Sequence, residues 1–320
     1  MNPHYQARQH KLTLVPWLLL AITTTVVGTI IALPPQSSRG IVSDDFTKSR
    51  PEAKSPEATK GSQRQSPSGA TAKPKPHRYR LASQPIKTPG PQTNARPKEQ
   101  PVPENIIAQL GITIWRLRPA TAGDTGARQL VRENGGSSEW IPERIEADTL
   151  LHHGDLVRLS IESPRTGYLY VIDRDEFSDG SAGETNLIFP IVGDDNHVYA
   201  GRLIDIPEVP FRASPKANQT GEMLDIIVTT VPLPLHLSNR VLPIAPSQLS
   251  QWEKMWGGET LRFEMEGGAG RAWTTEEQQA AARKGTRQLT RDDPAPQTIY
   301  RVSTTDNKAV LVNVRLRYGK

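Results

Sequence analysis

The chain has 320 residues, a net charge of +5 and no cysteine. The absence of cysteine excludes disulfides, thiolate nucleophiles, zinc–thiolate sites and iron–sulfur clusters. The positive charge is unevenly placed, because residues 1–33 carry +2, residues 34–103 carry +8 and the remainder carries −5. The basic character therefore belongs to the N-terminal third, and the mildly acidic remainder does not predict specific binding to nucleic acid.

Residues 12–33 form a run of 22 residues without a charge, which as a helix is long enough to cross a hydrocarbon core of roughly 30 Å. Arg8 and Lys11 precede this run without an acid, and by the positive-inside rule they place residues 1–11 in the cytoplasm. We expect a single-pass membrane anchor, with the following domain in the periplasm or outside the cell. Two alternatives are a cleaved signal peptide, which would make the protein secreted, and a buried core helix.

Residues 34–103 hold 13 of the 28 prolines and almost no large apolar residues. Such a segment cannot bury enough surface to offset the entropy lost on ordering. We therefore expect a disordered basic linker that is extended and partly polyproline II. Its role is either that of a spacer or that of an electrostatic contact with an anionic surface, such as lipid headgroups or an acidic polymer.

Residues 104–320 are dominated by short apolar runs separated by Pro, Gly and Asp, which is typical of strands. Strands are predicted at residues 111–117, 156–162, 167–173, 186–190, 202–207, 223–230, 261–266, 298–303 and 309–318. Two helices are expected, one capped by Ser247 and ended by Gly257, the other opened by a capping box of Thr274 and Glu277. The expected fold is mainly β, a β-sandwich or open barrel with two short peripheral helices.

The stretch GDLVRLSIESPRTGYLYVIDRD, residues 154–175, has the clearest pattern in the chain. Two alternating runs flank residues 164–167, so the stretch predicts a core hairpin with those four residues as its turn. In the second run Tyr168 and Tyr170 lie opposite Leu169 and Val171, and both faces are apolar. This strand is therefore expected to lie centrally and to be covered on both sides.

The same stretch, followed by NLIFP, NHVYAGRLIDIP and GEMLDIIVTT, resembles the domain of unknown function DUF4384. The similarity covers roughly residues 110–230 and consists of these motifs in the same order. The resemblance implies an exported or membrane-anchored bacterial β-domain, often an accessory to protein kinases or caspase-like peptidases. It implies no catalytic residues, and the chain contains nothing that resembles a kinase or peptidase domain.

An acidic segment follows this stretch, and its candidate metal ligands are Asp173, Asp175, Asp179 and Glu184. Oxygen ligands on alternate residues suit calcium, which takes six to eight oxygens. Counted from Asp173, however, only Glu184 matches the EF-hand pattern. An alternative is a hairpin connection whose Asp and Gly residues cap local backbone groups. A calcium site and a simple turn both remain open.

Motifs of catalysis are absent, since the sequence has neither G-x-S-x-G nor H-E-x-x-H. His152 and His153 are adjacent and would face opposite sides of a strand, and His197 and His236 are isolated. We expect no catalytic residues and no bound cofactor other than the possible calcium.

The expected function is that of a non-enzymatic binding module outside the cytoplasm, tethered to the membrane and directed at a protein partner. Trp252 and Trp256 share a face of the first helix, where they either pack on the sheet or form a partner groove. One alternative is a hydrolase whose site is assembled only in the fold. Another is a structural envelope component that contacts acidic polymers through the basic linker.

Overall fold

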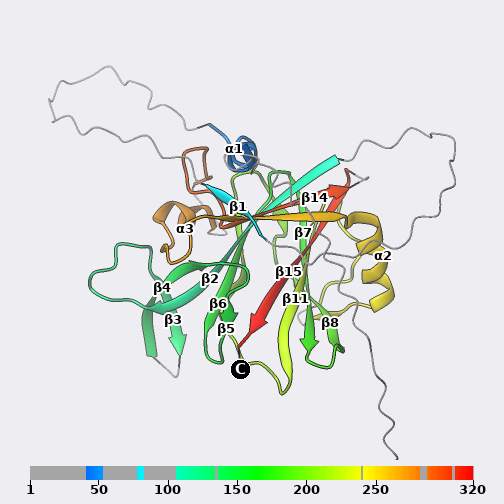
Figure 1. Ribbon diagram of the computed structural model, residues 1–320, viewed down its shortest axis with the longest axis horizontal. Coiled ribbons are helices and arrows are strands. Elements are labelled where there is room, and N and C mark those ends of the chain that lie inside the picture. Colours follow the sequence, from blue (N-terminus) through cyan, green and yellow to red (C-terminus); the bar gives the residue numbers. More distant parts are fainter. Residues whose placement is uncertain are drawn as a thin grey trace, which may run out of the picture. The chain divides into compact units, whose positions relative to one another are not determined.

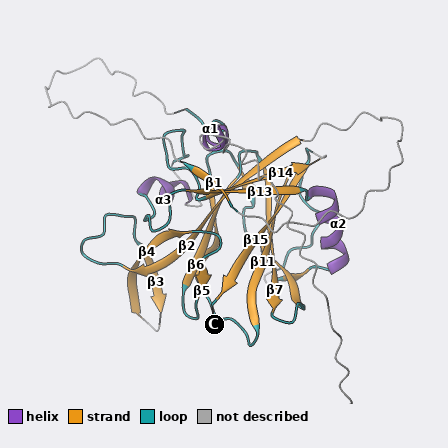
Figure 2. Ribbon diagram, viewed as in Figure 1, coloured by secondary structure: helices purple, strands orange, loops and turns teal. Residues whose placement is uncertain are grey.

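The computed structural model describes residues 41–52, 78–82, 106–133, 136–238, 241–281, 287–304 and 307–319. All of them belong to one compact unit, residues 37–320. They form mainly β-strands in two sheets, with three short helices at the periphery (Figures 1 and 2). The predicted mainly-β class is confirmed. The predicted anchor at residues 12–33 lies outside the described residues, among which no helix is long and apolar enough to cross a membrane.

Sheet A has eight strands, six of which follow the order β1-β13-β14-β2-β4-β3. The long strand β2 also pairs with β6, and β6 pairs with β10, which forms an outer edge. The strands are β1 (Tyr79–Leu81), β2 (Ile106–Pro119), β3 (Gln129–Glu133), β4 (Gly136–Ile145), β6 (Leu156–Glu162), β10 (Leu203–Arg212), β13 (Glu259–Met265) and β14 (Thr298–Thr304).

Sheet B has seven strands, in the order β12-β8-β7-β11-β15-β5, with β9 paired to β7. The strands are β5 (Leu150–Leu151), β7 (Gly167–Phe177), β8 (Ala182–Phe189), β9 (His197–Val198), β11 (Gln219–Thr229), β12 (Leu242–Pro243) and β15 (Ala309–Tyr318). Every strand predicted from the sequence is present, and β6 and β15 have the predicted bounds.

One apolar core is shared by the two sheets, because alternate residues of each strand face the opposite sheet. Its buried residues include Leu110, Ile112, Leu159, Ile161, Leu169, Val171, Ile226, Val228, Val312 and Val314. The other face of sheet B is covered by α2 (Pro246–Trp256), whose Leu249 and Trp252 pack on Tyr170 and Ile172. The prediction that residues 167–173 are covered on both faces is therefore confirmed, as is the packing of the α2 tryptophans on a sheet.

The predicted hairpin is wrong, because β6 and β7 lie in different sheets. β6 pairs with β2 and β10 in sheet A, whereas β7 pairs with β8, β9 and β11 in sheet B. Residues 163–166 thus carry the chain across the core from one sheet to the other. A hairpin and such a crossing both place Val157, Leu159, Leu169 and Val171 in the core, so alternation cannot distinguish them.

The helix ends agree with the sequence only in part. The α3 helix (Thr275–Ala281) has the predicted capping box, in which the backbone N–H of Glu277 donates to Thr274 Oγ1 at 3.1 Å and Glu277 Oε2 accepts from the backbone N–H of Thr274 at 3.0 Å. The α2 helix ends at Gly257 as expected. Its N-cap is Ala245, without a side-chain cap, because Pro246 takes the first helical position. Ser247 is therefore not the cap.

Two segments of the predicted linker, residues 41–52 and 78–82, are folded, so the prediction of disorder is wrong for them. The α1 helix (Ile41–Thr47) packs Phe46, which is fully buried, on the outer face of sheet A. A Cβ at Gly111 in β2 would lie only 2.6 Å from the Phe46 ring, so this glycine permits the close approach. β1 extends the sheet at β13. The remaining linker residues lie outside the described residues.

Arg50 fixes this N-terminal segment to sheet A. Its Nε and Nη2 donate to the two carboxylate oxygens of Glu162 at 2.6 Å each, and both side chains are almost fully buried. Its other N–H groups donate to the backbone oxygens of Thr290, Asp293 and Pro294. All five donors of the guanidinium therefore have acceptors, which is what a buried charge requires.

The Arg50→Ala substitution is expected to destabilise the full-length protein by about 3 kcal/mol or more, because it leaves Glu162 buried without its partner. Replacing both residues, as Arg50→Met with Glu162→Leu, should recover much of the loss. The measurement is denaturant unfolding followed by tryptophan fluorescence. Lys48→Ala removes an exposed ion pair of the same segment and should change little. Equal effects of Arg50→Ala and Lys48→Ala would contradict the role given to Arg50.

Candidate functional site

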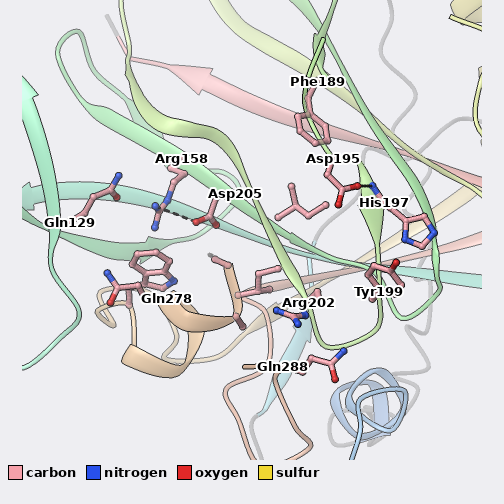
Figure 3. Close-up of a pocket in the computed structure, with 16 residues that line it drawn as sticks. Gln129, Arg158, Phe189, Asp195, His197, Tyr199, Arg202, Asp205, Gln278 and Gln288 are labelled. Carbon is pink, nitrogen blue, oxygen red and sulfur yellow. Dashed lines mark hydrogen bonds and ion pairs between the residues drawn. The ribbon is translucent and has the colours of Figure 1, made fainter. Parts of the chain in front are cut away.

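A cavity of about 790 Å³ lies beside β10, bordered by α3, β3 and the segment that contains β9 (Figure 3). Its walls are partly apolar, with Phe189, Leu203, Ile204 and Trp273, and partly polar. The polar lining residues are Gln129, Arg158, Asp195, His197, Tyr199, Arg202, Asp205, Gln278 and Gln288. This volume and this mixture of walls are typical of a small-molecule or side-chain pocket.

The edge strand β10 positions one wall of the cavity. Within the described residues it pairs only with β6, and alternate residues point to its two sides, so that Asp205 lies opposite Ser160 on the outer face of sheet A. Pro207 and Pro210 follow in the same strand and lack an N–H, which protects that part of the edge from pairing with another chain. Residues 203–205, which precede these prolines, line the cavity.

Arg158 is the buried charge of the cavity, with a relative exposure of 3 %. A chain of polar contacts holds its partner: the Trp115 indole N–H donates to Ser160 Oγ at 2.7 Å, and Ser160 Oγ donates to Asp205 Oδ1 at 2.5 Å. The other oxygen, Asp205 Oδ2, lies 3.3 Å from Arg158 Nη1. Asp205 is thus fixed from one side by Ser160 and pairs with Arg158 from the other.

Two tryptophans and two arginines, one of them Arg158, pack against one another at this pair. The guanidinium carbon of Arg158 lies 3.9 Å from the ring centre of Trp273, and the Trp273 ring lies 6.0 Å from that of Trp115. Arg144 lies over the far ring, 5.4 Å from the centre of Trp115. The flat face of the Arg158 guanidinium is therefore occupied, and only its edges can make further hydrogen bonds.

Several polar atoms of the cavity lining are buried without a hydrogen-bond partner in the part of the chain that the structure describes. They are the donors Nε and Nη2 of Arg158 and Nε1 of Trp273, the acceptor Oε1 of Gln129, and Nδ1 of His197. Buried donors without acceptors are rare in folded proteins, because each costs roughly 1–3 kcal/mol or more. Their gathering around one cavity marks this place as a candidate binding site.

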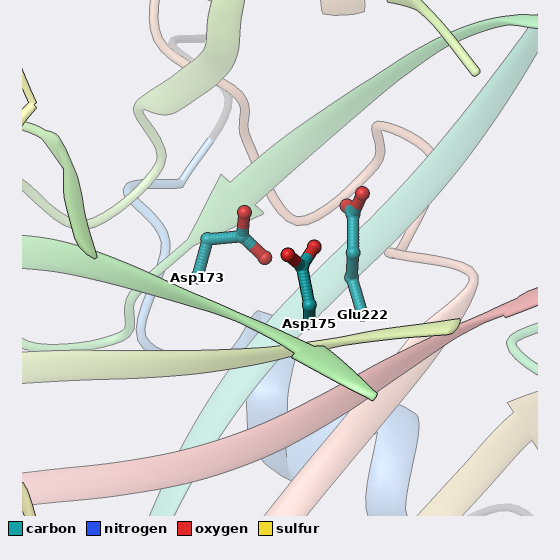
Figure 4. A group of neighbouring side chains, drawn as sticks. All are labelled: Asp173, Asp175 and Glu222. Atoms are coloured by element: carbon teal, nitrogen blue, oxygen red, sulfur yellow. The ribbon is translucent and has the colours of Figure 1, made fainter. Parts of the chain in front are cut away.

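The predicted metal ligands are only partly brought together. Asp173 and Asp175 stand on the same face of β7, and Glu222 of β11 lies directly opposite Asp175 (Figure 4). One oxygen from each of the three carboxyl groups lies within 4.8 Å of the others. Glu222 was not among the sequence candidates, because its pairing with β7 is a long-range contact.

The other two candidates are not members of this acidic triad. Asp179 lies in the β7–β8 turn, where its side chain accepts from the backbone N–H and hydroxyl of Ser181. Glu184 lies on β8 with an exposed side chain. The turn interpretation is therefore correct for Asp179. The calcium hypothesis stays a prediction, and the carboxylates that would serve it are now Asp173, Asp175 and Glu222.

Protein groups already contact the triad. Lys216 Nζ lies 2.5 Å from Asp175 Oδ2, Gln219 donates to Asp175 Oδ1 at 2.7 Å, and the Tyr318 hydroxyl donates to Glu222 at 2.6 Å. Asp173 keeps one buried oxygen without a partner. Burial, followed by the charges of Glu222 and Asp175, raises the pKa of Asp173 to about 7. Burial likewise raises the pKa of Glu222. Asp173 therefore titrates near neutral pH.

The four histidines within the described residues do not form a site with one another. His152, His153 and His236 are exposed. His197 lines the cavity, where its ring packs edge-on against Tyr168 and Tyr199 at 4.9 and 4.3 Å between ring centres.

Sequence reasoning missed the main residues of the cavity, Arg158, Asp205 and Trp273. The alternation of residues 156–162 places Arg158 on the polar face of its strand, and the placement of β6 and β7 in different sheets was not expected. The only signal available was the charged residue type itself, because the partners of Arg158 lie 47 and 115 positions away in the chain.

A scan against protein-family models finds no match to the chain, and searches of the curated proteins and of the solved structures find none either. The resemblance to DUF4384 therefore stays a prediction.

The Asp173→Asn substitution should stabilise the protein increasingly as the pH rises. The folded-state pKa of Asp173 is above its ordinary value of 3.8, so the ionised side chain destabilises the fold, and this cost grows between about pH 4 and pH 7 and then levels off. We expect a gain on the order of 1–2 kcal/mol above pH 7, after allowance for partial solvent exposure, and almost none at pH 4. Denaturant unfolding at a series of pH values measures it.

Asp179→Asn is the matched control for this experiment. Its side chain is exposed and its hydrogen bonds to Ser181 lower its pKa, so no gain is expected there. Parallel pH profiles for the Asp173→Asn variant and the unaltered protein would show that Asp173 ionises normally in the fold.

Proposed function

We propose that this chain is a non-enzymatic binding module, a two-layer β-sandwich held outside the cytoplasm by an anchor at residues 12–33. The cavity beside β10 is its ligand site. The observation that carries this proposal is the buried guanidinium of Arg158, which lines the cavity and has donors without acceptors. The resemblance to DUF4384 supports placement outside the cytoplasm, and a protein at the same surface is the proposed partner.

The polar groups of the cavity favour binding over catalysis. Asp205 is bonded to Ser160 and paired with Arg158, so its carboxylate has no free role as a base. Asp195 accepts from the backbone N–H of His197, whose ring Nδ1 has no hydrogen-bond partner. A general base needs an imidazole oriented by a second group, and no such group contacts this nitrogen.

The hydrolase alternative has one supporting observation, the acidic triad with its raised Asp173 pKa, because a carboxyl group that titrates near pH 7 suits acid–base catalysis. Asp175 lines a smaller hollow of about 240 Å³, but none of the three residues lines the large cavity. Activity towards ester, phosphoester or glycoside substrates that the Asp173→Asn substitution abolishes would favour this alternative.

Ala281→Trp is expected to abolish ligand binding without unfolding the domain, because Ala281 lines the cavity at the end of α3 and a large side chain there would fill it. The measurement is ligand-observed NMR on the full-length protein with a library of small organic acids, amides and amines. Gln279→Trp places the same side chain on the exposed face of α3 and should leave binding unchanged. No binding by the unaltered protein, or equal loss in both variants, would contradict the proposed site.

The full-length protein is expected in the membrane fraction and should resist extraction by high salt and alkaline carbonate, because a mostly apolar run of 22 uncharged residues would span the bilayer core. Deletion of residues 1–33 should release it. Replacing the five lysines and arginines of residues 53–77 by glutamine should leave it bound. Release by salt or by these replacements would instead favour the envelope component that contacts acidic polymers, and a mature chain that begins after residue 33 would show a cleaved signal peptide.

A further inference from the structure

Three arginines are buried among the described residues, and two of them, Arg50 and Arg158, differ in one respect. Arg50 and Arg158 have relative exposures of 2 % and 3 %, and both lie on the outer side of sheet A. Arg50 presents its Nε–Nη2 edge to the carboxylate of Glu162 in a two-point contact, with 2.6 Å at each nitrogen. In Arg158 the same two nitrogens have no acceptor. At Arg50 the group that occupies the Nε–Nη2 edge is a carboxylate, that of Glu162.

The positive charge of Arg158 is also less stabilised by its carboxylate partner than the charge of Arg50 is by Glu162. Burial lowers the pKa of Arg158, and Asp205 opposes this only in part. At Arg50 burial acts in the same direction, but the charge and hydrogen bonds of Glu162 outweigh it and the pKa is raised. Asp205 contacts Arg158 through Nη1 at 3.3 Å and leaves the opposite edge unused. The missing partner is therefore a second acceptor group with two oxygens.

The walls of the cavity select among anions. Two acids, Asp195 and Asp205, line it together with Arg158 and Arg202. These acids would repel a doubly charged phosphate more strongly than a carboxylate, which carries a single charge. Phe189, Leu203 and Ile204 provide apolar surface for the rest of the ligand. These features fit an organic acid with one carboxylate and an apolar body.

We propose that the Nε–Nη2 edge of Arg158 binds the carboxylate of such a ligand, in the geometry that Glu162 adopts on Arg50, with its apolar body in the cavity. The two nitrogens of this edge are buried, and Gln129 and Gln278 lie at the same end of the cavity as Arg158 (Figure 3). Rotation of these partly buried amide side chains admits the carboxylate, and the unpartnered Nε1 of Trp273 offers a further donor nearby. This inference rests on the proposed function, since it names the ligand class of the same cavity.

The carboxylate has two possible sources, a free small acid or the C-terminus of a peptide. The probes are N-acetyl-leucine and N-acetyl-leucinamide, and a short peptide that ends in leucine with a free or an amidated terminus. Isothermal titration calorimetry with the full-length protein measures their affinities. We expect each acid to bind at least about tenfold more tightly than its amide, because a hydrogen-bonded charge is lost in the amide. Tighter binding of the peptide than of N-acetyl-leucine would assign the site to a protein terminus, and the reverse would assign it to a small acid.

Two matched variants locate the carboxylate. Arg158→Lys keeps the charge next to Asp205 but removes the two-point edge, so the preference for the acid should fall by about tenfold. Arg202→Lys makes the same change at a second arginine of the cavity, one that donates to the backbone oxygen of Arg287, and should leave the preference intact. Loss in Arg202→Lys but not in Arg158→Lys would overturn the assignment to Arg158. The comparison of acid with amide on the unaltered protein needs neither variant to fold.

Failure of the inference is distinguishable from failure of the proposed function. If acid and amide bind equally and Ala281→Trp abolishes both, the cavity is a binding site but the carboxylate assignment is wrong. If inorganic phosphate displaces the acid and binds more tightly, the ligand class is wrong and the position is right. If neither these probes nor any member of the fragment library binds, both the inference and the proposed function are wrong.

Discussion

Burial of charge on the outer face of β6 governs how the rest of sheet A is covered. All seven residues of β6 are buried, although Arg158, Ser160 and Glu162 point away from the apolar core. Such groups are stable under a covering layer only if that layer brings partners of opposite charge or hydrogen-bonding character. These three residues accordingly bind two other parts of the chain. Glu162 holds the segment of Arg50, and Arg158 and Ser160 hold β10 through Asp205.

The cavity lies next to Arg158, where the covering layer does not supply a partner for every buried polar group. Arg50 and Arg144 have acceptors in the form of Glu162, Glu277 and backbone oxygens. At Arg158 the covering segments supply one carboxylate and an aromatic face, but no acceptor for the remaining edge. Proteins tolerate local departures from full hydrogen bonding mainly where a ligand completes the set. A buried guanidinium needs acceptors for its N–H groups. This requirement is met by Glu162 and backbone oxygens at Arg50, and it is left partly unmet at Arg158.

The features that were predictable from the sequence depend on neighbouring residues. Alternation located the strands, two apolar faces marked β7 as covered on both sides, and the spacing of Thr274 and Glu277 marked the start of α3. These signals are local, because each reflects side-chain direction or a backbone bond within a few positions.

The features that were missed depend on contacts between residues that are far apart in the sequence. The pattern around residues 164–167 is the same for a hairpin and for a crossing between sheets, so the true path of the chain was hidden. Glu222 joins Asp173 and Asp175 through strand register, and Arg50 was hidden in a segment whose composition favours disorder. The Arg50 side chain, whose five N–H groups all have acceptors, stabilises this segment on the domain although its composition favours disorder.

In the proposed topology, the position of Arg50 limits how far the domain can move from the membrane. A free linker of 70 residues could extend to about 250 Å. Because the chain is fixed to sheet A from α1 onward, only residues 34–40 separate the proposed anchor from the domain, and seven residues extend to at most about 25 Å. Residues 53–77 and 83–105 begin and end on the domain, so they add no length to the tether. In the proposed topology the domain works close to the bilayer surface, and a partner has to come to it.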